Sequence, residues 1–164
     1  MTEVHERLNA ATPEEAAGML GECCGSSTWV GRMLAMRPFA LAAEVHAAAE
    51  LALSELSRDD LLEAFAHHPR LGADPEKLRA RFSAQEQAGV AGADEATLAA
   101  LQRGNAEYEA RFGFVFLVCA TGKGADEILD LLEARIDHDP EVELRIAAGE
   151  LAKITHLRLD KLAA

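Results

Sequence analysis

Apolar residues recur at helical spacing along most of the chain, and residues that cap helices separate the repeats. The motif Thr12-Pro13-Glu14-Glu15 joins an N-cap threonine to a proline at the first helical position and a glutamate at the third, which predicts a helix from there to near Gly21. A second helix, capped by Ser26 or Ser27, must end near Arg37, because the residue before a proline avoids helical geometry.

The same signals predict further helices in the rest of the chain. One begins at Phe39, and the next starts at Ser57 and buries Leu61, Leu62 and Phe65. Two more helices are expected to begin at Asp74 and at Ser83. Three others are expected over residues 94–111, 126–137 and 140–162, the last of them capped by Asp139.

Residues 112–120 are ambiguous, because their β-branched and aromatic content suits a buried strand while their neighbours are helical. We interpret them as a buried, partly extended segment. The sequence therefore predicts an all-α fold with a single domain over residues 1–164, a bundle of about eight helices with one buried extended segment.

Charge and cysteine content narrow the possible partners and the location. With 16 basic and 28 acidic residues the net charge is −12, which opposes binding to nucleic acid or to an anionic membrane. Cys23, Cys24 and Cys119 are odd in number and include an adjacent pair, which is not typical of a secreted disulfide framework. Because there is also no signal-like N-terminus and no membrane-length apolar run, we expect a cytoplasmic protein.

The first candidate for chemistry is His68, in the run His67-His68-Pro69-Arg70-Leu71-Gly72. The following proline forces the chain to leave its helix, so His68 is expected on a stiffened loop. Imidazole titrates near neutral pH, and a fixed histidine suits general acid–base work. An ordinary capping or surface histidine explains the same residues.

The second candidate is the run Ser83-Ala84-Gln85-Glu86-Gln87, which brings a hydroxyl, a carboxylate and an amide to one helix N-terminus. Such an end attracts anions, and Gln87 could donate to a urea-like group. Structural capping alone also explains Ser83 and Glu86.

The third candidate is Arg158, which follows an apolar stripe along the last expected helix. The stripe residues share one helix face: Leu144, Ala147, Leu151 and Ile154. An arginine on that face either pairs with an internal carboxylate, reaches water past the helix end, or faces a cavity that binds an anion.

No metal site is predicted. The histidines outside the His67-His68 pair lack ligand spacing with a cysteine or carboxylate on one helix face: His5, His46, His138 and His156. Cys119 is expected to be buried and inert.

Five stretches, taken together and in their order along the chain, make the sequence resemble the OHCU decarboxylase family. OHCU is 2-oxo-4-hydroxy-4-carboxy-5-ureidoimidazoline. The five stretches are Trp29 with Arg37-Pro38-Phe39, the loop of residues 68–72, Ser83 to Gln87, residues 112–123, and Leu157-Arg158-Leu159. The resemblance covers most of the chain. It implies an all-helical, cofactor-free carboxy-lyase, usually a homodimer, that converts OHCU to (S)-allantoin in urate degradation.

The resemblance also implies roles for particular residues. The catalytic histidine of the family falls on His68 rather than His67, and Glu86 and Arg158 complete the expected catalytic set. Substrate-binding positions fall on Pro69, Ser83, Gln87, Leu117, Val118, Cys119 and Ala120. We expect Phe114 and Phe116 to line a dry pocket.

Two other functions fit the same residues. One is a non-catalytic helical interaction module, in which the His68 loop and the Arg158 end of the stripe complete an interface. The other is a metal-dependent hydrolase that uses His67, His68 and Glu86.

Overall fold

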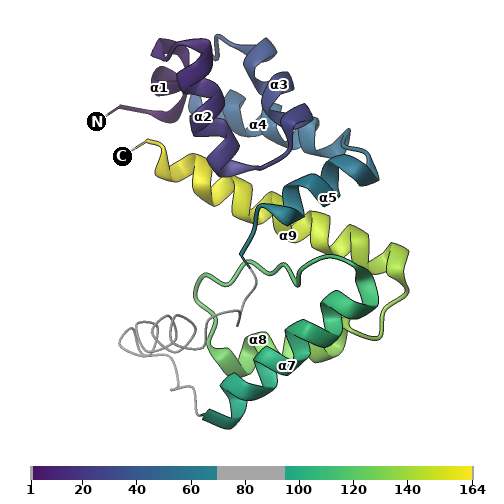
Figure 1. Cartoon of the computed structure of the whole chain (residues 1–164). Coiled ribbons are helices and arrows are strands. Elements are labelled where there is room, and N and C mark those ends of the chain that lie inside the picture. The colour runs from purple at the N-terminus through teal and green to yellow at the C-terminus, as the bar shows by residue number, and fades with distance from the viewer. Residues whose placement is uncertain (1, 70–94, 164) are drawn as a thin grey trace. The chain divides into compact units, whose positions relative to one another are not determined.

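The computed structural model describes residues 2–69 and 95–163, and these contain eight helices and no strand (Figure 1). The predicted all-α class is therefore confirmed. The helices expected to begin at Asp74 and Ser83 lie outside the described residues. The chain divides into two compact units: Met1–His67 with Ala148–Ala164, and His68–Ala147. The single domain remains a prediction.

Six helical elements build the first unit. They are α1 (Val4–Ala10), α2 (Pro13–Cys23), α3 (Ser27–Met36), α4 (Ala42–Ser54), α5 (Arg58–Ala66) and the later part of α9 (Pro140–Lys161). α3 packs against α2, α4 and α5. Its Trp29 is fully buried and donates its indole N–H to the Ala49 carbonyl of α4 at 3.2 Å. This bond satisfies the polar atom of the largest side chain in the core.

The predicted helix starts in this unit follow from local capping. The Thr12 hydroxyl accepts from the Glu15 N–H at 3.1 Å, and Ser26 accepts from the Trp29 N–H at 3.1 Å. Ser57 and Asp60 form a reciprocal capping box at the start of α5. Each cap satisfies an N–H that has no partner within its helix.

Three details of the sequence interpretation are wrong. α1 was not expected, although Glu3 and Glu6 form a capping box there. α4 begins at Ala42 instead of Phe39, because Phe39 is tied to the chain before α2 through Asn9. In α5 only Phe65 of the three expected residues is buried, while Leu61 and Leu62 are half-buried.

Two histidines that the sequence left as ordinary residues join α4 to α9 within the first unit. The Nδ1 atoms of His46 and His156 lie 2.8 Å apart. Each Nε2 faces a carboxylate of the other helix, Asp160 at 2.9 Å and Glu50 at 3.1 Å. Both helices thus contribute a histidine and an acid four residues later, and the crosswise pairing fixes their antiparallel register.

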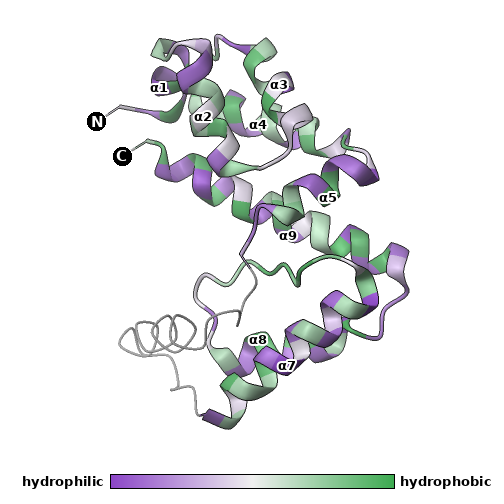
Figure 2. Ribbon diagram, viewed as in Figure 1, coloured by the Kyte–Doolittle hydropathy of each residue, from purple (hydrophilic) through white to green (hydrophobic). Residues whose placement is uncertain are grey.

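The second unit contains α7 (Glu95–Phe112), α8 (Ala125–Arg135) and the start of α9. α7 and α8 lie side by side, and the segment that joins them is largely hydrophobic (Figures 1 and 2). Gly113 and Gly122, near the two ends of this segment, have φ of 81° and 76°, a conformation that favours glycine. Residues 112–120 were expected to form a buried, partly extended segment; Phe112 instead ends α7, and residues 113–120 form neither helix nor strand and are mostly buried.

Aromatic rings fill the core of the second unit. Tyr108 lies 4.6 Å from Phe112, 5.9 Å from Phe114 and 5.1 Å from Phe116, measured between ring centroids. Phe114 and Phe116, expected to line a dry pocket, therefore pack against Tyr108. None of the described helices combines the length and apolarity needed to cross a bilayer.

Replacing Thr12 by alanine should lower the free energy of unfolding by about 1 kcal/mol, because the Glu15 N–H loses its acceptor. The matched control is Thr12→Ser, which keeps the hydroxyl and should retain most of the stability. Urea denaturation followed by far-ultraviolet circular dichroism measures both. An alanine variant as stable as the parent would show that this cap contributes nothing.

Candidate active site

His68 lies where the sequence predicts, directly after the end of α5. The helix ends at Ala66, and the His67 N–H donates back to the carbonyls of Ala64 and Phe65. His68 is 8% exposed, while Pro69, which follows it, is exposed. The predicted exit of the chain from its helix before Pro69 is confirmed, and the His68 imidazole is shielded from bulk water.

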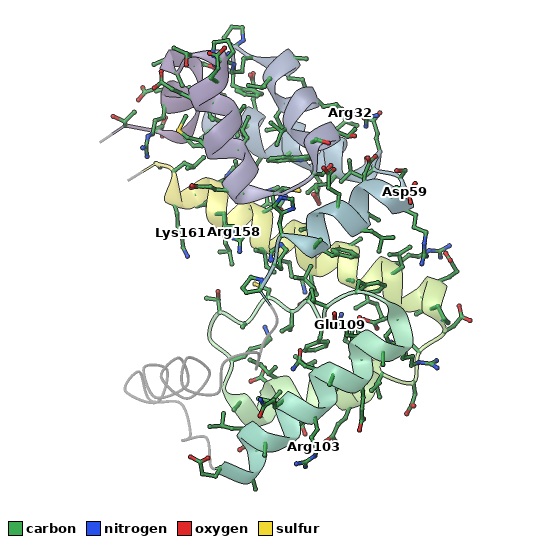
Figure 3. All side chains as sticks on the ribbon, in the orientation of Figure 1. Arg32, Asp59, Arg103, Glu109, Arg158 and Lys161 are labelled. Atoms are coloured by element: carbon green, nitrogen blue, oxygen red, sulfur yellow. The ribbon has the colours of Figure 1, made fainter. Side chains whose placement is uncertain are left out.

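Arg158 lies on α9 in the first unit, near the exposed Lys161 (Figure 3). Its guanidinium is half-buried and donates to the Glu22 carbonyl of α2 at 3.2 Å. Within the described part of the chain no carboxylate lies at ion-pair distance from it, so the internal ion pair that we considered is not found there. Among residues 2–69 and 95–163, the partner that Arg158 contacts is therefore a neutral acceptor.

One short stretch of the first unit contacts both Arg158 and the end of α5. Glu22, at the end of α2, accepts from Arg158, and Gly25, three residues later, packs against the ring of His67. Ser27 reinforces the contact with α5, because its N–H and hydroxyl both donate to the Glu63 carboxylate, at 3.0 and 3.1 Å. His68 is bonded to His67, so this stretch anchors the residue from which His68 extends.

Two cationic side chains hold the expected backbone-binding segment, residues 117–120, in the second unit. Arg135 donates to the Leu117 carbonyl at 2.8 Å, and Lys123 donates to the Cys119 carbonyl at 3.0 Å. Leu117, Cys119 and Ala120 are buried, and Val118 is half-buried. The described residues form no strand beside this segment, and the two donors satisfy two of its backbone carbonyls.

Arg135 also belongs to a buried network around Glu143, which is 0% exposed. The Glu143 carboxylate accepts from Arg135 Nε at 2.9 Å and Nη2 at 2.6 Å, and its other oxygen lies 3.1 Å from His138 Nδ1. The Tyr108 hydroxyl donates to it as well. Burial and this hydrogen bond raise the pKa of Tyr108, so the phenol stays a neutral donor.

Sequence reasoning missed this network, although a usable signal was present. Glu143 lies four residues before Ala147 and eight before Leu151, so it falls on the same apolar side of α9 that singled out Arg158. An acid on such a face requires a buried partner. Nothing in the sequence identifies that partner as Arg135, across the turn before α9.

The expected burial of Cys119 is confirmed, and the other two cysteines are buried as well. Cys23, Cys24 and Cys119 are all free and buried. Burial raises the pKa of Cys23 to about 12 and raises that of Cys24 as well, although Arg158 acts in the opposite direction on both. Neither Cys23 nor Cys24 forms an appreciable thiolate near neutral pH.

One group of described residues has ligand atoms close enough to share a metal ion: Glu3, His5 and Glu6. Both acids are exposed, and they already form the capping box of α1. The expected site residues Ser83, Glu86 and Gln87 lie outside the described residues.

Comparison with known proteins assigns the family. The family described as OHCU decarboxylase matches residues 9–160. The chain belongs to the OHCU decarboxylase family. This match includes most of both units and confirms the resemblance inferred from the sequence.

Solved and curated members of the family support the assignment. The crystal structure of OHCU decarboxylase in the presence of (S)-allantoin matches with a TM-score of 0.75 and 32% identity, over 93% of this chain and 98% of that one. An OHCU decarboxylase of Haloferax volcanii is 30% identical over 155 residues, 94% of this chain and 92% of that protein.

A longer relative matches over part of its length. The uric acid degradation bifunctional protein TTL of Arabidopsis thaliana is 37% identical over 145 residues, which are 85% of this chain. The match spans 45% of the Arabidopsis protein, so the chain corresponds to less than half of it.

Replacing Arg135 by methionine should lower the free energy of unfolding by about 3–5 kcal/mol, because Glu143 would remain as a buried charge without its main partner. The double variant Arg135→Met with Glu143→Leu removes both charges and should recover part of that loss. Urea denaturation of the two variants and the parent measures the difference. A double variant no more stable than Arg135→Met would contradict the account of a paired buried charge.

Proposed function

We propose that this chain catalyses the cofactor-free decarboxylation of OHCU to (S)-allantoin in urate degradation. The observation that carries the proposal is the family match over residues 9–160, supported by the solved OHCU decarboxylase with (S)-allantoin. As a member of this family the chain is a carboxy-lyase.

The substrate can accept the electrons of its own decarboxylation. The departing carboxylate sits on a carbon that also bears a hydroxyl and lies next to a ring C=N bond. When the C–C bond breaks and CO₂ leaves, the electron pair moves toward that C=N bond, and a proton must then be delivered to give allantoin. The reaction therefore needs no separate electron sink of the kind that cofactors supply.

His68 is our candidate for proton transfer in this reaction. It takes the hydroxyl proton of the substrate or delivers the proton to the ring, and a single imidazole suits either role near neutral pH. Its burial and its fixed position after α5 support the assignment, because proton transfer requires a defined geometry. Glu86 fixes the ureido arm or holds the histidine in one protonation state.

Arg158 is our candidate for binding the substrate anion. A guanidinium forms strong charge-assisted hydrogen bonds with a carboxylate. Its contact with the Glu22 carbonyl leaves its charge uncompensated among the described residues, which supports a role with an anionic ligand. To accelerate the reaction, its interactions must favour the transition state over the bound substrate.

The remaining proposed contacts orient the rest of the molecule. Residues 117–120 contact the substrate through the backbone, and the Arg135 and Lys123 bonds that fix two carbonyls of this segment support such a rigid role. Pro69, Ser83 and Gln87 complete the proposed binding set. Ser83 and Gln87 supply a hydroxyl and an amide that suit a urea-like group.

We also propose that the protein acts as a cytoplasmic homodimer. Three large apolar side chains of the first unit are exposed, which supports an interface on that unit: Leu41 at 59%, Leu51 and Leu157. The three free, buried cysteines support a reducing compartment.

The experiment that tests the function couples urate oxidase and hydroxyisourate hydrolase with and without the protein and follows chiral allantoin by circular dichroism. The protein should speed the decay of OHCU and give (S)-allantoin. Unchanged decay would favour a non-catalytic interaction module, and activity that exhaustive chelation abolishes would favour the metal-dependent hydrolase.

Replacing His68 by alanine should reduce turnover about 10²–10⁴-fold in this assay, because general acid–base assistance contributes about that much. The melting temperature and circular dichroism spectrum should remain close to those of the parent. Near-normal turnover of freshly generated OHCU would remove His68 from the mechanism.

Replacing Arg158 by alanine should raise KM about 10- to 100-fold, the range for a lost hydrogen bond to a charged group. Lys161→Ala is the matched control, since it removes an exposed cation from the same end of α9 and should leave KM unchanged. Initial rates across substrate concentrations measure both. Equal effects of the two substitutions would indicate general electrostatic attraction instead of a specific contact.

A further inference from the structure

Gly25, between α2 and α3, lies so close to His67 that no side chain would fit at position 25. A Cβ atom placed on Gly25 would lie 2.4 Å from His67 Cγ, 2.6 Å from His67 Cβ and 2.6 Å from His67 Nδ1. Carbon atoms in contact normally lie about 3.5–4.0 Å apart. Because the φ of Gly25 is outside the left-handed region, space and not backbone conformation requires glycine here.

His67 cannot relieve this contact by turning its side chain. One of the three clashing atoms is its Cβ, which is bonded to the backbone and does not move when the ring rotates. The ring Nδ1 lies 3.0 Å from the Glu63 carbonyl, and the His67 N–H caps the last turn of α5. A side chain at position 25 would therefore displace the backbone at the end of α5.

The loop itself cannot move away freely either. Two residues after Gly25, Ser27 donates through its N–H and its hydroxyl to the Glu63 carboxylate on α5. On the other side, Glu22 accepts from Arg158. The loop is thus tied to α5 and to α9 on either side of the glycine.

We propose that Gly25 is a positioning residue for His68. By lacking a side chain it allows His67 to lie directly against the α2–α3 loop, and this contact fixes the backbone from which the next residue, His68, extends. The inference rests on the proposed role of His68 in proton transfer. Gly25 would thus influence the position of His68 although it is distant in the sequence and does not take part in the reaction.

Other glycines of the described chain provide a contrast. Gly18, Gly21, Gly31 and Gly149 would each place a Cβ in open space. At Gly104 the nearest atom is Leu132 Cδ2 at 2.9 Å, the far end of a flexible side chain. Gly25 differs because its neighbour is the base of a side chain on an anchored helix end.

The test is the Gly25→Ala variant in the coupled allantoin assay. We expect kcat to fall roughly 10- to 100-fold, since a misplacement of about 1 Å at a reacting group can cost that much. KM should stay within about twofold of the parent, because proton transfer and not substrate binding is disturbed. Gly31→Ala, an exposed change on α3 into open space, is the matched control and should leave both constants unchanged.

A second substitution separates positioning of His68 from a general structural role. His67→Gly removes all three clashing atoms, so Gly25→Ala should change kcat less than about twofold in that background. His67→Ala keeps the Cβ contact, so rescue in that background should be partial. If Gly25→Ala alone does not fold, the comparison of its effect in the His67→Gly and His67→Ala backgrounds gives the same test.

The outcomes distinguish this inference from the proposed function. A Gly25→Ala variant with normal kcat, alongside an inactive His68→Ala variant, would overturn the positioning role and leave the function intact. A loss of kcat that is equal in the His67→Gly background would also overturn it. Normal turnover by His68→Ala would instead refute the role of His68 itself.

Discussion

The packing of α7, α8 and the start of α9 in the second unit depends on the buried carboxylate of Glu143. Its hydrogen-bond partners are Tyr108 on α7, Arg135 on α8 and His138 in the turn between α8 and α9. Removing a charge from water costs several kcal/mol, and only converging donors offset that cost. The carboxylate therefore favours one arrangement of these elements. Arg135 also donates to the Leu117 carbonyl, so the same charge pair helps to hold the irregular segment that contains Leu117.

In the first unit, the end of α2 and the loop between α2 and α3 contact both α5 and α9. This loop is held by the bond from Arg158 to the Glu22 carbonyl and by the bonds from Ser27 to the Glu63 carboxylate, and Gly25 packs against His67. The Glu22 carbonyl accepts a hydrogen bond from Arg158, and Gly25 allows His67 to approach closely. The proposed anion-binding residue and the residue before the proposed proton-transfer group are thus anchored to the same few residues. In the proposed function these anchors serve the decarboxylation of OHCU.

Interactions between residues that are close in the sequence could be predicted, and interactions between residues far apart in the sequence could not. Thr12, Ser26 and Ser57 cap their helices through partners three residues away, so their helix starts could be read directly. Arg158, which the periodicity of α9 put on the apolar side, is half-buried, while Thr155 and Leu159 of the same helix are fully buried. In contrast, His46 and His156 are 110 positions apart in the sequence, so their contact could not be predicted from local patterns. The contact between Gly25 and the side chain of His67 could not be predicted from them either. Ser83, Glu86 and Gln87 remain predictions, because they lie outside the described residues.

The most direct test of the central claim is a crystal structure of this protein with (S)-allantoin bound. The claim is that His68, Glu86 and Arg158 act on the same substrate molecule. It predicts that all three side chains lie within hydrogen-bond distance of one bound allantoin, with residues 117–120 contacting it through their backbone. A bound allantoin that contacts neither His68 nor Arg158, or that is reached by only one of them, would contradict the account.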